Sequence, residues 1–188
     1  MRRFVMVFTV VVLILWAWSV IPSQADDEGI TTVIMVRHAE EDRTKEEIPL
    51  TDGGRKRALE LARVLEKVNI SVIYATPTAR AKETAGPLAR KKGLPIREYN
   101  YNGYGELPGV TASFLKEHKG KVVFIAGHSD DVPMMSAIMS RQIGPGKEIQ
   151  FMNKGIYDTL IILSVPDKGT ATVLELKYGE PSVPVAAK

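Results

Sequence analysis

The chain has 188 residues and no cysteine, so one domain with a short appendage is expected, and neither a disulfide framework nor a thiolate metal site can form. The formal charge of +3 falls to +1 without residues 1–25, which contain two arginines and no acidic residue. No block of lysine and arginine interleaved with aromatic residues remains, so the composition gives no indication of nucleic-acid binding.

The first 25 residues have the pattern of a secretory signal. Two arginines precede an apolar run over residues 4–21, and the small residues Ser23 and Ala25 stand before an acidic stretch. We therefore expect a signal peptide at residues 1–25 and a protein exported to the periplasm or the extracellular space. The apolar run of about 18 residues is also long enough to span a bilayer, so a membrane anchor at residues 4–21 is the alternative. Either way, membrane association is expected only through this segment.

Strand-like and helix-like stretches alternate along the rest of the chain. Runs rich in apolar and β-branched residues predict strands at 31–36, 71–75, 95–99, 121–126, 157–165 and 170–178. Apolar positions at helical spacing, with their start and stop signals, predict helices from about 51–54 to 65, over 78–92, from 109 to 118 and over 131–143.

This order of elements predicts an α/β fold, a three-layer α/β/α sandwich with a mainly parallel sheet. The last two strands are joined by Pro166 to Gly169 and should form a C-terminal hairpin. We expect one catalytic domain over residues 26–179 and a disordered tail over residues 180–188.

Polar residues follow three of the predicted strands. Arg37 and His38 end the first strand, Arg80 stands shortly after the second, and His128 and Ser129 follow the strand at 121–126. Ligands of such sheets bind outside the carboxyl ends of the strands, so these residues should converge on one site.

The residue types at this site suit phosphoryl transfer. Arginine offers a planar fork of donors that matches phosphate and stays charged at any working pH. A neutral imidazole is a good nucleophile and can form a covalent phosphohistidine. The alternative for His38 is a structural histidine at the end of a strand that only hydrogen-bonds to the backbone. The presence of Arg37, Arg80 and His128 argues against it. His118 lies among charged residues and is expected to be a solvated helix end. No histidine spacing suits a metal site, so no metal or other cofactor is expected.

Three motifs together resemble the histidine phosphatase superfamily, which has the phosphoglycerate mutase-like fold. They are Val-Arg-His-Ala-Glu at residues 36–40, the arginine after Ala-Thr-Pro-Thr-Ala at residue 80, and Ala-Gly-His-Ser at residues 126–129. The short chain is similar to the small phosphohistidine-phosphatase-like branch. The resemblance implies that His38 is the phosphorylated nucleophile and that Arg37, Arg80 and His128 bind phosphate; Ser129, beside His128, is a further candidate.

The chain departs from the family pattern in three places. Ala39 stands where mutase-like members have glycine, and Thr44 stands near the place of a phosphate-contacting asparagine. The glutamate that serves as general acid is also displaced, so we take Glu106 as the candidate acid and Asp130 as its rival. A displaced acid favours substrates with good leaving groups, such as phosphoramidates and acyl or aryl phosphates.

The sequence therefore predicts an exported, metal-independent histidine phosphatase that hydrolyses small phosphate monoesters or related phosphoryl compounds. Three alternatives remain open: a non-catalytic phosphate- or phosphosugar-binding module, a phosphomutase and a structural envelope protein. The physiological substrate and the oligomeric state are not indicated.

Overall fold

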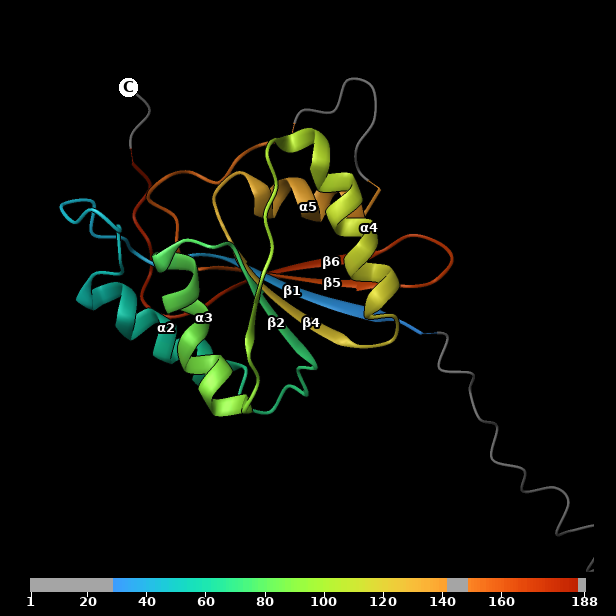
Figure 1. The fold of residues 1–188 in the computed structure, drawn as a ribbon, viewed down its shortest axis with the longest axis horizontal. Coiled ribbons are helices and arrows are strands. Elements are labelled where there is room, and N and C mark those ends of the chain that lie inside the picture. The colour runs from blue at the N-terminus through green and yellow to red at the C-terminus, as the bar shows by residue number, and fades with distance from the viewer. Residues whose placement is uncertain (1–28, 142–148, 186–188) are drawn as a thin grey trace, which may run out of the picture.

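Six strands form one sheet in the order β3-β2-β4-β1-β5-β6 (Figure 1). The computed structural model describes residues 29–141 and 149–185. The strands are β1 (Thr31–Arg37), β2 (Val72–Ala75), β3 (Ile96–Glu98), β4 (Val122–Gly127), β5 (Thr159–Val165) and β6 (Thr172–Lys177). The first four are parallel to one another, whereas β5 runs antiparallel to β1 and pairs with β6 as a hairpin. The predicted mainly parallel sheet and C-terminal hairpin are confirmed.

In the described parts of the chain, four α-helices and one 3-10 turn lie between the strands. They are α2 (Asp52–Val64), α3 (Ala79–Lys92), η1 (Tyr104–Glu106), α4 (Leu107–Glu117) and α5 (Asp131–Met139). The hydroxyl of Thr51 caps α2, the hydroxyl of Thr78 caps α3, and Gly93 ends α3 with a left-handed φ of 65°. These are the start and stop signals from which the two helices were predicted.

Helix α5 is shorter than predicted. It was expected to continue to residue 143 but ends at Met139, where the Ser140 hydroxyl donates to the Ser136 carbonyl. Such a bond offers the last turn a partner outside the regular helical ladder. Beyond Met139, only Ile143 continues the apolar pattern within the predicted helix, and periodicity alone does not fix where a helix ends.

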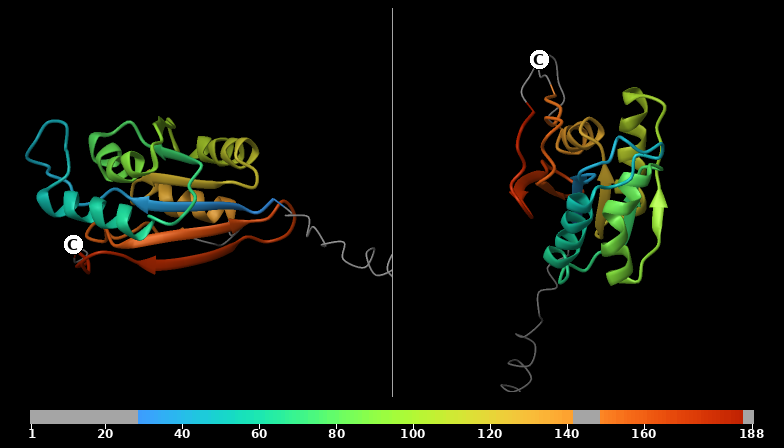
Figure 2. Two further views of the ribbon diagram at one scale, coloured as in Figure 1. Left: turned by 90° about the horizontal axis from the view of Figure 1, so that it is seen from below. Right: turned by 90° about the vertical axis from the view of Figure 1, so that its left-hand side faces the viewer.

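The helices cover both faces of the sheet and make three layers (Figure 2). Successive strand residues point to opposite faces, so Ile34 and Val36 of β1 pack with Leu61 of α2 and Leu88 of α3. Their neighbours in β1, with β4, pack instead against the cluster that contains residues of α4 and α5. The predicted three-layer sandwich is confirmed.

The carboxyl ends of the parallel strands meet at one edge of the sheet. In the register, Arg37 of β1 lies opposite Gly127 of β4, and Ala75 of β2 lies opposite Ala126. The amide of His38 donates to the Gly127 carbonyl at 2.8 Å, which carries the alignment one residue beyond the strand. The residues that follow β1, β2 and β4 are thereby placed together.

The structure describes most of the C-terminal tail but none of the predicted signal peptide. The predicted signal peptide at residues 1–25 and the last three residues of the predicted tail lie outside the described residues. In the described part of the chain, no helix is long and apolar enough to cross a membrane. Tail residues 180–185 run as coil beside the loop before β5, where Asn153 bonds to the Val185 backbone and the Ser182 amide donates to Asp158.

Candidate active site

A cleft of about 300 Å³ lies at the carboxyl edge of the sheet. Its lining combines basic, acidic and aromatic side chains: Arg37, His38, Glu41, Arg43, Arg80, Tyr104, His128, Ser129, Asp130, Phe151 and Lys154. The structure thus brings together five predicted site residues, Arg37, His38, Arg80, His128 and Ser129. Four basic and two acidic side chains line the cleft, so its formal charge of +2 with neutral histidines matches a phosphate dianion.

The ring of His38 is held in one tautomer. Its Nδ1 lies 2.8 Å from the carbonyl oxygen of Ala39 and 3.1 Å from Oε2 of Glu41. Neither oxygen can donate while Glu41 is ionised, so Nδ1 must carry the proton. Nε2 is then left with its lone pair, which is the form that a nucleophile needs.

Burial keeps the His38 ring neutral. The residue is only 3% exposed, and this burial lowers its pKa to about 4 even though the Ala39 carbonyl and Glu41 favour the cation. Burial also opposes ionisation of Glu41, but the hydrogen bonds from Arg43 and the neighbouring cationic groups outweigh it, so the pKa of Glu41 falls. At neutral pH the pair is a neutral imidazole beside a carboxylate.

Arg37 is fixed by the backbone of the loop before β5. Its Nη1 donates to the carbonyls of Asn153, Lys154 and Ile156 at 3.1, 2.8 and 3.0 Å. The guanidinium carbon also lies 4.1 Å from the ring centroid of Tyr157, a cation–π contact. The buried Nε has no hydrogen-bond partner among the described residues. A rigid guanidinium with spare donors is suited to binding an anion.

His128 stands beside the nucleophile. The His38 and His128 rings are 5.3 Å apart between centroids and nearly perpendicular, and Nη2 of Arg80 donates to Nε2 of His128 at 3.3 Å. The backbone amide of His128 donates to Oδ1 of the fully buried Asp131, whose other oxygen accepts from Tyr99. Burial lowers the pKa of His128, although Asp131 opposes this. Two histidines and Arg80 therefore surround one position at the base of the cleft.

The strand end before His128 requires glycine. A Cβ on Gly127 would lie 2.5 Å from Oδ1 of Asp131 and 2.7 Å from the Tyr99 hydroxyl. This close approach is what allows Asp131 to cap the turn that presents His128.

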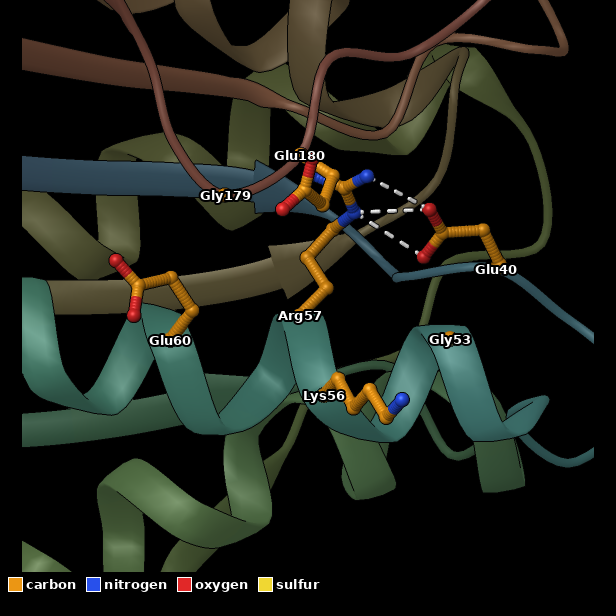
Figure 3. Close-up of a pocket in the computed structure, with 7 residues that line it drawn as sticks. All are labelled: Glu40, Gly53, Lys56, Arg57, Glu60, Gly179 and Glu180. Carbon is orange, nitrogen blue, oxygen red and sulfur yellow. Dashed lines mark hydrogen bonds and ion pairs between the residues drawn. The ribbon is translucent and has the colours of Figure 1, made fainter.

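The two residues after His38 are clamped from two helices. The Ala39 amide donates to the hydroxyl of the buried Thr84, which in turn donates to the Arg80 carbonyl. Arg57 of α2 forms a two-pronged ion pair with Glu40 (Figure 3). Its Nη1 also donates to the Tyr178 carbonyl. These contacts fix the nucleophile's loop relative to Arg80 on α3.

A second cleft of about 530 Å³ lies beside Arg57, on helix α2 and the Gly179–Glu180 segment (Figure 3). It is larger than the cleft over His38, but it contains no histidine, and its arginine is occupied by Glu40. We therefore take the smaller cleft as the candidate active site, because the two histidines and Arg37 and Arg80 meet there.

The structure separates the two candidate acids. Glu106 does not line the cleft over His38, and its carboxylate accepts hydrogen bonds from the amide and side chain of Asn102. Asp130 does line it, with its Oδ2 accepting from the Tyr104 hydroxyl at 2.7 Å. Burial favours the protonated form of Asp130, but the bonds from Tyr104 and from backbone amides outweigh it and lower the pKa. Asp130 is therefore positioned near the reaction but is ionised at neutral pH.

His118 was predicted to be solvated, and this was wrong. The residue is 4% exposed, and its Nε2 lies 2.9 Å from the hydroxyl of Tyr74 inside the molecule. Its neighbour Glu117 lies close by, with Oε1 3.6 Å from Nε2 of His118, but the His118 side chain itself is buried at the end of α4. It lies far from His38 in the chain and does not line the cleft.

Sequence reasoning did not find Glu41, Tyr157, Thr84 or Arg57. Glu41 stands in a highly charged stretch that looked like a solvated loop, and the other three act through contacts between distant parts of the chain. The only local signal for Glu41 was its place as the second of two consecutive glutamates that follow the Arg-His pair after one alanine. Among the described residues, no group of histidine, aspartate and glutamate side chains could hold a metal ion.

The described residues place two histidines and two arginines at the carboxyl edge of a mainly parallel sheet, and residues of these types suit the binding of a phosphoryl group. Residues 33–101, which include Arg37, His38 and Arg80, match the family model of the histidine phosphatase superfamily (branch 1). This match and the fold confirm the resemblance drawn from the sequence.

Solved structures with the same fold include phosphatases with different substrates. The protein histidine phosphatase SixA bound to tungstate has 19% identity and a TM-score of 0.60, covering 78% of this chain and 96% of that one. Bacillus stearothermophilus YhfR has 20% identity and a TM-score of 0.60, covering 76% and 95%. A mycobacterial glucosyl-3-phosphoglycerate phosphatase has 16% identity and a TM-score of 0.57, covering 72% and 90%. A search of curated protein sequences found no match.

Proposed function

We propose that this protein is an exported phosphatase that hydrolyses phosphate monoesters or related phosphoryl compounds through a phosphohistidine at Nε2 of His38. The family match and the fold support phosphatase activity. The main support for a covalent mechanism is that Nδ1 of His38 contacts both the Ala39 carbonyl and Glu41. These contacts leave Nε2 free beside Arg80 and His128.

In the first step, Nε2 of His38 attacks phosphorus and the bond from phosphorus to the leaving oxygen breaks. Arg37, Arg80 and His128 would hold the phosphoryl oxygens, where negative charge is spread in the transition state. The His38 ring becomes cationic as it is phosphorylated, and the adjacent Glu41 carboxylate stabilises that charge. The incoming dianion also raises the pKa of His128, so that this ring can add a donor.

In the second step, water attacks the phosphohistidine. The bond between phosphorus and Nε2 breaks, the electron pair returns to the imidazole, and the proton of the water leaves with the phosphate product. The net reaction consumes one water molecule and releases an alcohol or phenol and inorganic phosphate. The positive charge that it needs comes from Arg37 and Arg80, so we propose that no metal ion is required.

Export is proposed on the N-terminal pattern alone: two arginines, the apolar run and the small residues before the acidic stretch. Mass spectrometry of the protein recovered from the envelope or medium of a bacterial host should show a chain that begins at Asp26. A full-length chain in the membrane fraction would instead support an anchor at residues 4–21.

The test of the activity is phosphate release from para-nitrophenyl phosphate by the purified full-length chain, with and without EDTA. We expect turnover that survives the chelator and is lost in His38→Ala. Phosphate binding without turnover by the wild type would favour the non-catalytic binding module.

A further inference from the structure

Two exposed aromatic rings stand at the mouth of the cleft. Tyr104 of η1 and Phe151, in the loop before β5, line the same cleft as His38 and His128. Their ring centroids are 5.7 Å apart with a tilt of 41°, and the two residues are 44% and 51% exposed. Neither ring belongs to the hydrophobic clusters of the described core. The Tyr104 hydroxyl donates to Asp130, and both aromatic residues still remain about half open to solvent beside the charged pocket.

In-line attack by His38 would direct the leaving group toward Tyr104 and Phe151. His38 and Arg37, each 3% exposed, form the base of the cleft. In phosphoryl transfer the attacking and leaving atoms are roughly in line. Attack by Nε2 from the base therefore drives the leaving oxygen outward, toward the open side where Tyr104 and Phe151 lie.

Two carboxyl groups of the described residues line the cleft, Glu41 and Asp130, and neither is a proton donor to that oxygen at neutral pH, because the pKa of each is lowered. Asp130 is ionised, because the hydrogen bonds to its carboxylate lower its pKa although burial opposes this. Burial raises the pKa of Asp131, but this residue is fully buried and accepts bonds from the His128 amide and Tyr99. Glu106 lies outside the cleft. A leaving group that departs unprotonated must be a stable anion. A phenol, with a pKa of about 10, meets this requirement far better than an alcohol, whose hydroxyl is a much weaker acid, like that of water.

We propose that Tyr104 and Phe151 form a binding subsite for an aromatic leaving group, so that aryl phosphates are the preferred substrate class. This inference rests on the proposed function. In the productive complex the aryl ring packs on the pair, the bond from phosphorus to the phenolic oxygen breaks, and the phenolate leaves with the electron pair. It takes its proton from water after departure. Aromatic pairs of this kind add binding energy beyond the area they bury.

Three substrates distinguish binding of the aromatic ring from the preference for a good leaving group. Phenyl phosphate has an aromatic ring and a good leaving group, benzyl phosphate has the ring but an alkoxide leaving group, and cyclohexyl phosphate has neither. We expect kcat to be highest for phenyl phosphate, and KM to be lower for both aromatic esters than for the cyclohexyl ester.

The variant Phe151→Leu keeps an apolar side chain but removes the ring. We expect it to raise KM for phenyl and benzyl phosphate about threefold to tenfold and to raise KM for cyclohexyl phosphate less. Phe151 is half exposed, so the fold should tolerate the change. Leu59→Ala, an exposed apolar residue on α2, is the control and should change none of these values.

Equal effects of Phe151→Leu on all three esters, or no effect on any, would overturn the subsite. Failure of the wild type to turn over any ester would instead contradict the proposed function. In that case equilibrium binding decides the subsite: phenyl phosphate should bind more tightly than inorganic phosphate to the wild type, and equal affinities would overturn it.

Discussion

Nδ1 of His38 and Oε2 of Glu41 lie 3.1 Å apart, with 4% and 5% of the two side chains exposed. A histidine and a carboxylate three residues apart thus form a buried pair directly behind the nucleophilic nitrogen. The carboxylate is held in turn by Arg43, whose Nε donates to Oε1 at 2.8 Å. This arrangement orients the ring and places negative charge where the phosphorylated imidazole becomes positive.

Replacing Glu41 should slow the reaction without abolishing it. Glu41→Gln removes a charge-assisted hydrogen bond, which is worth about 1.5–3 kcal/mol, so kcat should fall about tenfold to hundredfold. Steady-state kinetics with para-nitrophenyl phosphate measure the change. The matched control is Glu46→Gln, an exposed glutamate of the same loop, which should keep full activity. Equal kcat in Glu41→Gln and the wild type would remove Glu41 from the mechanism.

The buried His38 should make the free protein less stable in acid. Because burial lowers its pKa from 6.5 to about 4, the unfolded chain binds more protons between these values. The free energy of unfolding should therefore fall as the pH drops from about 6.5 to 4, with about 3 kcal/mol lost through this residue. Urea unfolding at several pH values measures this, and His38→Gln should show a shallower fall. A midpoint near 6.5 for His38 in an NMR titration would contradict it.

The Arg57–Glu40 pair should matter more than an ordinary surface pair of the same helix. Arg57 is 6% exposed, and its removal leaves Glu40 and the Tyr178 carbonyl without their partner. Arg57→Ala should lower the free energy of unfolding by about 2–4 kcal/mol, the lower part of this range reflecting the partial exposure of Glu40. The control is Arg63→Ala, which breaks an exposed pair with Glu60 and should cost about 0.5 kcal/mol or less. An equal loss of unfolding free energy in the two variants, measured by denaturant unfolding, would contradict the special role of the Arg57–Glu40 pair.

Adding one methyl group at Gly127 should disturb the second histidine. In Gly127→Ala the new Cβ would collide with Asp131 and Tyr99, so we expect a loss of about 1–3 kcal/mol in stability together with lower activity. Gly109→Ala in α4 is the control, because a Cβ there meets nothing within 4 Å and alanine favours a helix. Thermal unfolding of the two variants compares them. A Gly127→Ala protein as stable and active as the wild type would show that the turn can relax.

The sequence was sufficient to predict the sheet and the place of the site. The β-branched run before Arg37 and the apolar run before Gly127 predicted two strands, and the rule for parallel sheets then brought His38 and His128 together. Caps such as Thr51 and Gly93 fixed the helix ends because their signals are local.

What the sequence could not predict depends on contacts between distant segments. The Phe151 ring contacts Tyr104, and the loop before β5 supplies three carbonyls to Arg37. No local sequence pattern encodes either contact. The prediction that His118 is exposed was wrong for the same reason. It was based on the charged neighbours in sequence, whereas Tyr74, the hydrogen-bond partner of the buried ring, lies in β2.

The most direct test of the central claim is to trap the covalent intermediate. The full-length chain would be mixed with excess para-nitrophenyl phosphate, quenched in alkali within one turnover and examined by peptide mass spectrometry. We predict an added phosphoryl group on the peptide that contains His38, stable in alkali, lost in acid and absent from His38→Ala. Turnover by the wild type without any phosphoryl group on His38 would contradict covalent catalysis by this residue.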